Sequence, residues 1–115
     1  MKVNIVAEKS MQFAVRIVNA YKLLVERKEF VLSKQMLRSG TSIGANVRES
    51  SQAQSKLDFI SKLGIALKEC NETKYWIELL NKTEYFSDKE YDSLNTDCNE
   101  LFAILTAIIK TSKGE

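Results

Sequence analysis

Apolar residues recur along this chain at the three-to-four-residue spacing of an α-helix, in four separate segments. The first segment covers residues 4–27 and carries one stripe of this kind, formed by Phe13, Ile17, Ala20 and Leu24. A second stripe lies beside it, formed by Met11, Ala14, Val18, Tyr21 and Val25. The two stripes together are wider than one bundle interior requires. They predict either a second buried contact or a central position for this helix.

Three further helices are expected over residues 33–50, 55–81 and 87–110. All four predicted helices open on a residue type that caps helix N-termini, namely Asn4, Ser33, Ser55 and Ser87. The last two serines are followed three residues later by a carboxylate, which is the capping-box pattern. The third helix is expected to face inward with Phe59, Ile60, Leu63, Ala66, Leu67, Cys70, Ile77 and Leu80, and the fourth with Tyr91, Leu94, Cys98, Leu101, Leu105 and Ile108.

The connections between these segments are short, and the chain contains no proline and only four glycines. Without proline, helices can run uninterrupted, and short connections make neighbouring helices antiparallel. The sequence therefore predicts an all-α fold, an antiparallel up-down-up-down four-helix bundle. Residues 1–115 are expected to form one domain.

Two of the four glycines, Gly40 and Gly44, stand inside the second predicted helix. A glycine in a helix interior costs roughly 1 kcal/mol relative to alanine, so two of them require a reason. At this spacing they share one helical face with Ile43 and Val47, and that face lets another backbone approach closely. The segment is predicted to be a tight helix crossing. Ser42, Asn46 and Glu49 are expected to lie beside this crossing and to form hydrogen bonds with backbone groups or with the neighbouring helix.

The net charge of +2 is small, but its distribution is uneven. Residues 1–54 carry 9 Lys/Arg against 4 Asp/Glu, whereas residues 55–115 carry 8 against 11. An anionic partner is therefore expected at the N-terminal half, although mixed charge also suits solvated helix faces. The candidate nucleic-acid-binding residues are Arg16, Lys22, Lys34, Arg38 and Arg48.

The chain has no histidine, so it lacks the most frequent general base and the most frequent metal ligand. Carboxylates at the spacing of a di-iron bundle occur without the histidine such sites use, at Glu69, Glu72, Asp97 and Glu100. Cys70 and Cys98 show no metal-ligand spacing and fall at apolar positions. The sequence therefore predicts no catalytic residue, no metal and no cofactor.

Neither a membrane nor a secretory segment is expected. The first residues contain no apolar stretch long enough for a signal peptide, and the most apolar run, residues 101–109, is less than half a membrane span. A cytoplasmic location is expected.

Tyr75 and Trp76 are interpreted as a core or interface anchor, with base stacking as the alternative.

Several separated motifs resemble a known family. The run over residues 38–49 reads RSGTSIGANVRE and resembles the hallmark of the four-helix-bundle family linked to 23S ribosomal RNA intervening sequences. The first and third predicted helices carry further matching positions, namely Lys9, Ser10, Phe13, Ala14, Asp58, Phe59, Leu63, Ile65, Ala66, Leu67, Glu69, Glu72 and Trp76.

This resemblance implies a non-enzymatic helical bundle that assembles into a homopentameric barrel. The family includes proteins encoded within 23S rRNA intervening sequences. It also includes the accessory variability determinants of diversity-generating retroelements, which bind nucleic acid and a reverse transcriptase. That branch is strongly basic, whereas this chain is nearly neutral. The expected function is an oligomeric accessory or scaffold protein that binds RNA or DNA; the alternative is a protein-interaction module with a protein partner and no nucleic acid.

Overall fold

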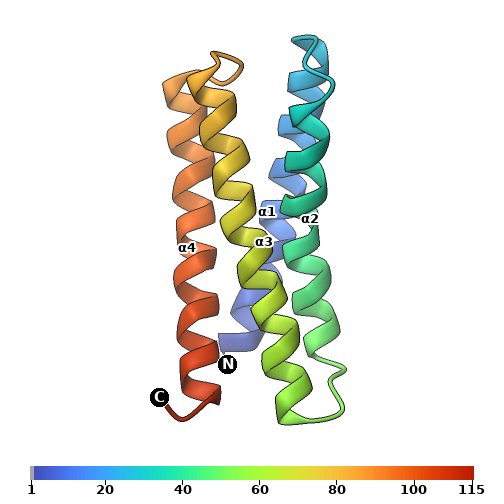
Figure 1. Ribbon diagram of the computed structural model, residues 1–115, viewed down its shortest axis with the longest axis vertical. Coiled ribbons are helices and arrows are strands. Elements are labelled where there is room, and N and C mark those ends of the chain that lie inside the picture. Colours follow the sequence, from blue (N-terminus) through green and yellow to red (C-terminus); the bar gives the residue numbers. More distant parts are fainter. Residues whose placement is uncertain (1) are drawn as a thin grey trace.

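The computed structural model describes residues 2–115 and is built from four long helices (Figure 1). They are α1 (Lys2–Glu26), α2 (Leu32–Ser50), α3 (Lys56–Lys82) and α4 (Asp88–Ser112). Successive helices run in opposite directions along a bundle that measures 44 × 21 × 18 Å (Figure 1). No strand occurs within residues 2–115. The predicted all-α, antiparallel four-helix bundle is confirmed.

The helices pack in the order in which they follow one another. Helix α1 packs against α2 and α4, and α3 packs against the same two helices. Over the described chain, the diagonal pairs α1/α3 and α2/α4 do not pack against each other. The α1/α4 contact and the α2/α3 contact therefore lie on opposite sides of the bundle. This arrangement decides which polar side chains can share a surface.

The first predicted stripe of α1 is buried in full, since Phe13, Ile17, Ala20 and Leu24 all belong to the core. Four of the five residues in the second stripe are half-buried, and the fifth, Met11 at its N-terminal end, is 48% exposed. Met11 and Ala14 of this stripe face α2 residues across a groove. The second stripe therefore lies on the flank of α1 that borders α2, and it is incompletely covered there.

In the third and fourth helices, most predicted inward positions are buried, and four are half-buried: Phe59, Ile60, Leu67 and Tyr91. The predicted caps of both helices are found. Ser87 forms a complete capping box with Glu90, because the Glu90 N–H donates to Ser87 Oγ and the Ser87 N–H donates to Glu90 Oε1. Ser55 accepts from the Asp58 N–H at 3.0 Å, but the Asp58 carboxylate accepts from the N–H of Gln54.

Glu90 also joins the end of α1 to the start of α4. The Arg27 guanidinium donates to both Glu90 carboxylate oxygens, at 2.8 and 2.9 Å, and to the Tyr85 carbonyl at 2.6 Å. These bonds from Arg27, followed by the backbone N–H of Ser87, lower the pKa of Glu90 to about 2. The two helix ends are therefore held by a charge-assisted, bidentate contact.

The other two predicted caps are wrong. Asn4 lies inside α1, which begins at Lys2. Ser33 lies inside α2 and is buried. The start of α2 is instead capped by a carboxylate from the preceding connection, that of Glu29.

Glu29 accepts three backbone hydrogen bonds at the start of α2. The donors are the N–H groups of Val31, Leu32 and Ser33, at 3.2, 3.0 and 2.5 Å. Ser33 Oγ donates in return to the Glu29 carbonyl at 2.9 Å. Burial alone would raise the pKa of Glu29, but the three N–H groups outweigh it and lower the pKa. A negative charge at a helix N-terminus is also favoured by the helix dipole.

Candidate functional site

The two helical glycines lie where α2 meets α1. A Cβ atom at Gly40 would lie 2.8 Å from Ile17 Cγ1, and one at Gly44 would lie 3.3 Å from the backbone oxygen of Ser10. Both distances are shorter than ordinary contacts of a Cβ atom. The missing side chains therefore allow α1 and α2 to approach closely, with Gly44 set against backbone and Gly40 against a core side chain.

The other residues of the same segment lie on different sides of α2 and have different contacts. Ile43 is fully buried in the core, and the buried Ser39 Oγ accepts a hydrogen bond from Thr73 of α3 at 2.9 Å. Asn46 bonds within its own helix, where its Nδ2 donates to the Ser42 carbonyl at 2.9 Å. Glu49 is exposed. The segment therefore contacts α1, the core and α3 at once, which leaves it little freedom to vary.

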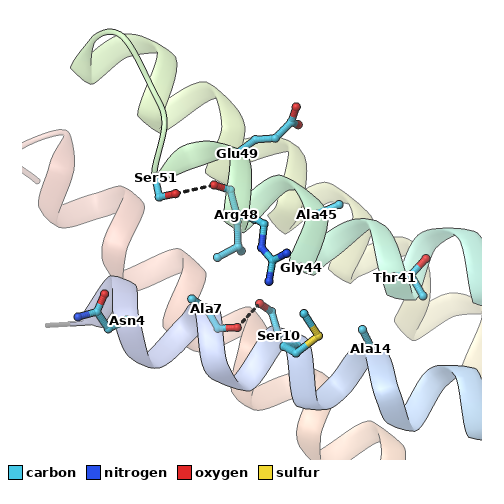
Figure 2. Close-up of a pocket in the computed structure, with 12 residues that line it drawn as sticks. Asn4, Ala7, Ser10, Ala14, Thr41, Gly44, Ala45, Arg48, Glu49 and Ser51 are labelled. Atoms are coloured by element: carbon cyan, nitrogen blue, oxygen red, sulfur yellow. Dashed lines mark hydrogen bonds between the residues drawn. The ribbon is translucent and has the colours of Figure 1, made fainter.

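A groove opens beside Gly44, between the N-terminal half of α1 and the C-terminal half of α2 (Figure 2). Its volume is about 830 Å³. Half of its twelve lining residues are apolar, namely Ala7, Met11, Ala14, Gly44, Ala45 and Val47, and small hydroxyl side chains (Ser10, Thr41 and Ser51) line it as well. We call this surface the α1–α2 groove.

Two exposed apolar side chains extend this groove. Met11 in its lining is 48% exposed, and Val15, one helical turn further along α1, is 54% exposed. The Arg48 guanidinium lies between the two helices, whereas the Glu49 carboxylate points away from α1 (Figure 2). The groove is therefore an apolar surface with charge at its edge.

Two of the five candidate nucleic-acid-binding residues are engaged within the molecule, on opposite sides of it. Arg16 of α1 donates to Asp97 of α4 at 2.6 Å and also to Ser93. Arg38 of α2 pairs with Glu69 and Glu72 of α3. The five residues therefore do not form one basic patch.

The remaining three share the outer side of the α1–α2 pair. Arg48 lines the groove, and Lys34 precedes the groove residue Thr41 by seven positions, which is two helical turns on the same side of α2. Lys22 follows the groove residue Met11 by eleven positions, or about three turns of α1. Over residues 2–115, none of the three lies within ion-pair distance of a carboxylate.

The uneven charge of the two chain halves has a structural origin. Every interhelical ion pair found among the described residues joins a base of α1, the α1–α2 connection or α2 to an acid of α3 or α4: Lys9–Glu100, Arg16–Asp97, Arg27–Glu90, Arg38–Glu69 and Arg38–Glu72. Such exposed pairs each contribute about 0–1 kcal/mol. The excess of bases in residues 1–54 thus serves pairing within the bundle to a large extent.

The carboxylates spaced like a di-iron site are all part of these pairs. No cluster of three or more His, Cys, Asp or Glu suited to a metal occurs in the described part of the chain. Nor does any helix of residues 2–115 combine the length and apolarity needed to cross a bilayer.

The aromatic pair on α3 divides between packing and exposure. Trp76 is half-buried against the core, and its Nε1 donates to Glu72 at 3.3 Å. Tyr75 meets the Trp76 ring edge to face at 5.0 Å between centroids and is 59% exposed. Trp76 is thus held beside the ion pairs that Arg38 forms with Glu69 and Glu72. The sequence could not indicate this arrangement, because its members come from two helices.

Comparisons with known proteins agree with this structure. A sequence model of the family described as 23S rRNA-intervening sequence protein matches residues 2–107. A crystal structure from Bacteroides thetaiotaomicron VPI-5482, described as a protein of unknown function from the S23 ribosomal protein family, is 64% identical. The match covers 96% of this chain and 99% of that chain, with a TM-score of 0.94. A search of curated proteins gave no match. The chain therefore belongs to the family of 23S rRNA-intervening sequence proteins.

Proposed function

We propose that this protein is a non-enzymatic scaffold that assembles from identical copies through its α1–α2 groove, as a homopentamer by the family resemblance, and acts in the cytoplasm. The observation that supports this proposal is the apolar groove beside Gly44. Contiguous exposed apolar surface on a soluble protein marks an interaction site. The absence of histidine from the sequence supports the non-enzymatic part.

The composition of the groove suits a helix as its occupant. Small side chains such as Ala7, Ala14 and Ala45 present little bulk, so another helix can pack closely there. Met11 and Val15 are exposed, and their burial would stabilise an assembly by about 25 cal/mol per Å² of apolar area. Contact between the groove and a different patch on the next copy forms a ring if the rotation closes.

A charge introduced into the groove tests this assembly. We expect Ala45→Glu, at an exposed groove position, to lower the sedimentation coefficient to that of a 13.1 kDa monomer, because a carboxylate would be buried without a partner. Leu57→Glu is the matched control, since Leu57 is 78% exposed and lies at the start of α3, outside the groove. Assembly that survives Ala45→Glu, or that Leu57→Glu abolishes, would place the interface elsewhere.

A second candidate function is binding of RNA or DNA, which Lys22 and Lys34 favour. Both lie near the α1–α2 connection, at the opposite end of these helices from the groove, and neither has a carboxylate partner among the described residues. Phosphate contacts need such free cations. The surface around Lys22 and Lys34 would thus remain available to a nucleic acid when the groove is buried in an assembly.

Fluorescence anisotropy with labelled RNA and DNA tests this second function. If it is correct, affinity falls steeply with salt, and Lys22→Glu with Lys34→Glu reduces the slope of log K against log [salt] by about 2. Lys56→Glu with Lys68→Glu on α3 is the control with the same change of charge and should leave the slope unchanged. Absence of binding at low ionic strength would leave a protein partner as the alternative.

A further inference from the structure

Two cysteines that are 28 positions apart meet inside the bundle. Cys70 lies near the middle of α3 and Cys98 near the middle of α4, and both side chains are fully buried. Their Sγ atoms are 3.7 Å apart. Each sulfur also contacts the opposite backbone, since Cys70 Sγ lies 3.4 Å from the Cys98 carbonyl oxygen and Cys98 Sγ lies 3.5 Å from that of Cys70.

We propose that Cys70 and Cys98 form a dithiol site that an oxidant of the hydroperoxide class converts into an intramolecular disulfide, which cross-links α3 to α4. This inference is independent of the proposed assembly and of nucleic-acid binding. It rests on the contact between the two thiols across the α3/α4 interface. In an ordinary core each thiol would face an apolar side chain.

The contact brings both residues within the range of a disulfide. An S–S bond is about 2.05 Å long and joins residues whose backbones are close. The two sulfurs must approach by about 1.7 Å from their present separation. Each sulfur already touches the backbone of the other residue, so the two backbones are close at this point.

The two thiols share a hydrogen bond in which either sulfur can be the donor. With the Cys98 thiol as the donor, this bond lowers the pKa of Cys70, whereas the bond together with burial raises the pKa of Cys98. The thiolate is the nucleophile in cysteine oxidation. This favours Cys70 as the sulfur that attacks the oxidant and Cys98 as the sulfur that resolves the product, and the reverse order gives the same disulfide.

In the first step the Cys70 thiol gives up its proton and the thiolate attacks one peroxide oxygen. The O–O bond breaks, the departing hydroxide takes up that proton as water, and Cys70 becomes a sulfenic acid. In the second step Cys98 Sγ attacks the sulfenic sulfur, the S–O bond breaks, and the departing hydroxide takes the Cys98 proton as water. Two thiols and one hydrogen peroxide thus give one disulfide and two water molecules. The sulfurs lose two electrons, and the peroxide gains them.

Burial determines the rate and the consequence of this reaction. Both side chains are inaccessible in the closed bundle, so the oxidant reaches them only through local opening of α3 from α4. Once formed, the disulfide closes the loop between residues 70 and 98 and restricts the unfolded chain. The oxidised bundle is therefore expected to be harder to unfold.

Intact-mass measurement after treatment with hydrogen peroxide tests the proposal. The folded protein is treated, quenched with catalase, and unfolded in N-ethylmaleimide. We expect a monomeric chain that has lost the mass of two hydrogens and takes up no maleimide, and dithiothreitol should restore two reactive thiols. Its melting temperature should rise by about 5–10 °C relative to the reduced protein.

The variants Cys70→Ala and Cys98→Ala serve as controls, since neither can form the internal bond. The measurement on the unaltered protein does not depend on either variant folding well. Two thiols that remain alkylatable, oxygen added to sulfur without loss of hydrogen, or disulfide-linked dimers would each overturn the proposal.

Discussion

At the scale of single residues, the helical glycines differ most in what faces them. Gly44 and Gly64 both lie inside helices, but they have different surroundings. A Cβ atom at Gly44 would press on the Ser10 backbone, whereas one at Gly64 would meet nothing within 4 Å. The same helix-weakening residue therefore has a packing reason at one position and none at the other.

We expect Gly44→Leu to lower the free energy of unfolding by about 1–3 kcal/mol, because the side chain would overpack the α1–α2 crossing. Gly64→Leu should raise it by up to about 1 kcal/mol, since leucine is the better helix former and the site is open. Urea unfolding at one fixed protein concentration measures both changes. Equal effects of the two substitutions would show that the crossing does not limit side-chain size.

Residue spacing predicted this crossing, because two glycines four positions apart have few other uses in a helix. It could not indicate which helix lies opposite Gly40 or Gly44. Ile17 and Ser10 occupy that place only because α1 and α2 run antiparallel with a particular register. In the same way, Cys70 and Cys98 were each predicted to be inward, while their mutual contact follows from the register of α3 and α4.

At the scale of helices, the sequence predicted the body of each one better than its ends. Ser87 was identified correctly because its capping partner Glu90 is three residues away and forms a local motif. Ser33 was misassigned because the actual cap, Glu29, comes from the connection before α2. The Glu29 carboxylate accepts the N–H groups of Val31, Leu32 and Ser33, so the helix begins before Ser33, and the serine hydroxyl donates to the Glu29 carbonyl instead.

We expect Glu29→Gln to lower the free energy of unfolding at pH 7 by about 1–2 kcal/mol, through weaker acceptance of the α2 N–H groups. The folded state lowers the pKa of Glu29, so its contribution is complete above its ordinary pKa of 4.5 and is lost as pH falls below that value. The difference between the two proteins should accordingly narrow below about pH 4.5. Thermal unfolding across this range measures it, and a gap that stays constant with pH would contradict the charged cap.

At the scale of the whole molecule, charge was the least reliable guide from sequence. The excess of bases in residues 1–54 predicted a partner-binding half, yet Arg16 and Arg38 pair with acids of the other half on opposite sides of the bundle. Only packing order could reveal this, because it decides which helix faces each base. Of the three candidate bases without a carboxylate partner among the described residues, Arg48 lines the groove, whereas Lys22 and Lys34 lie at the opposite end of α1 and α2.

We propose above that the α1–α2 groove makes this bundle a self-assembling scaffold. The most direct test is the light-scattering mass of the unmodified protein at low salt, measured with and without a mixed pool of RNA and DNA. We predict a particle near five times 13.1 kDa that forms without nucleic acid. Added mass in the presence of the pool would add the second function to it. A monomer of 13.1 kDa under both conditions would contradict the account.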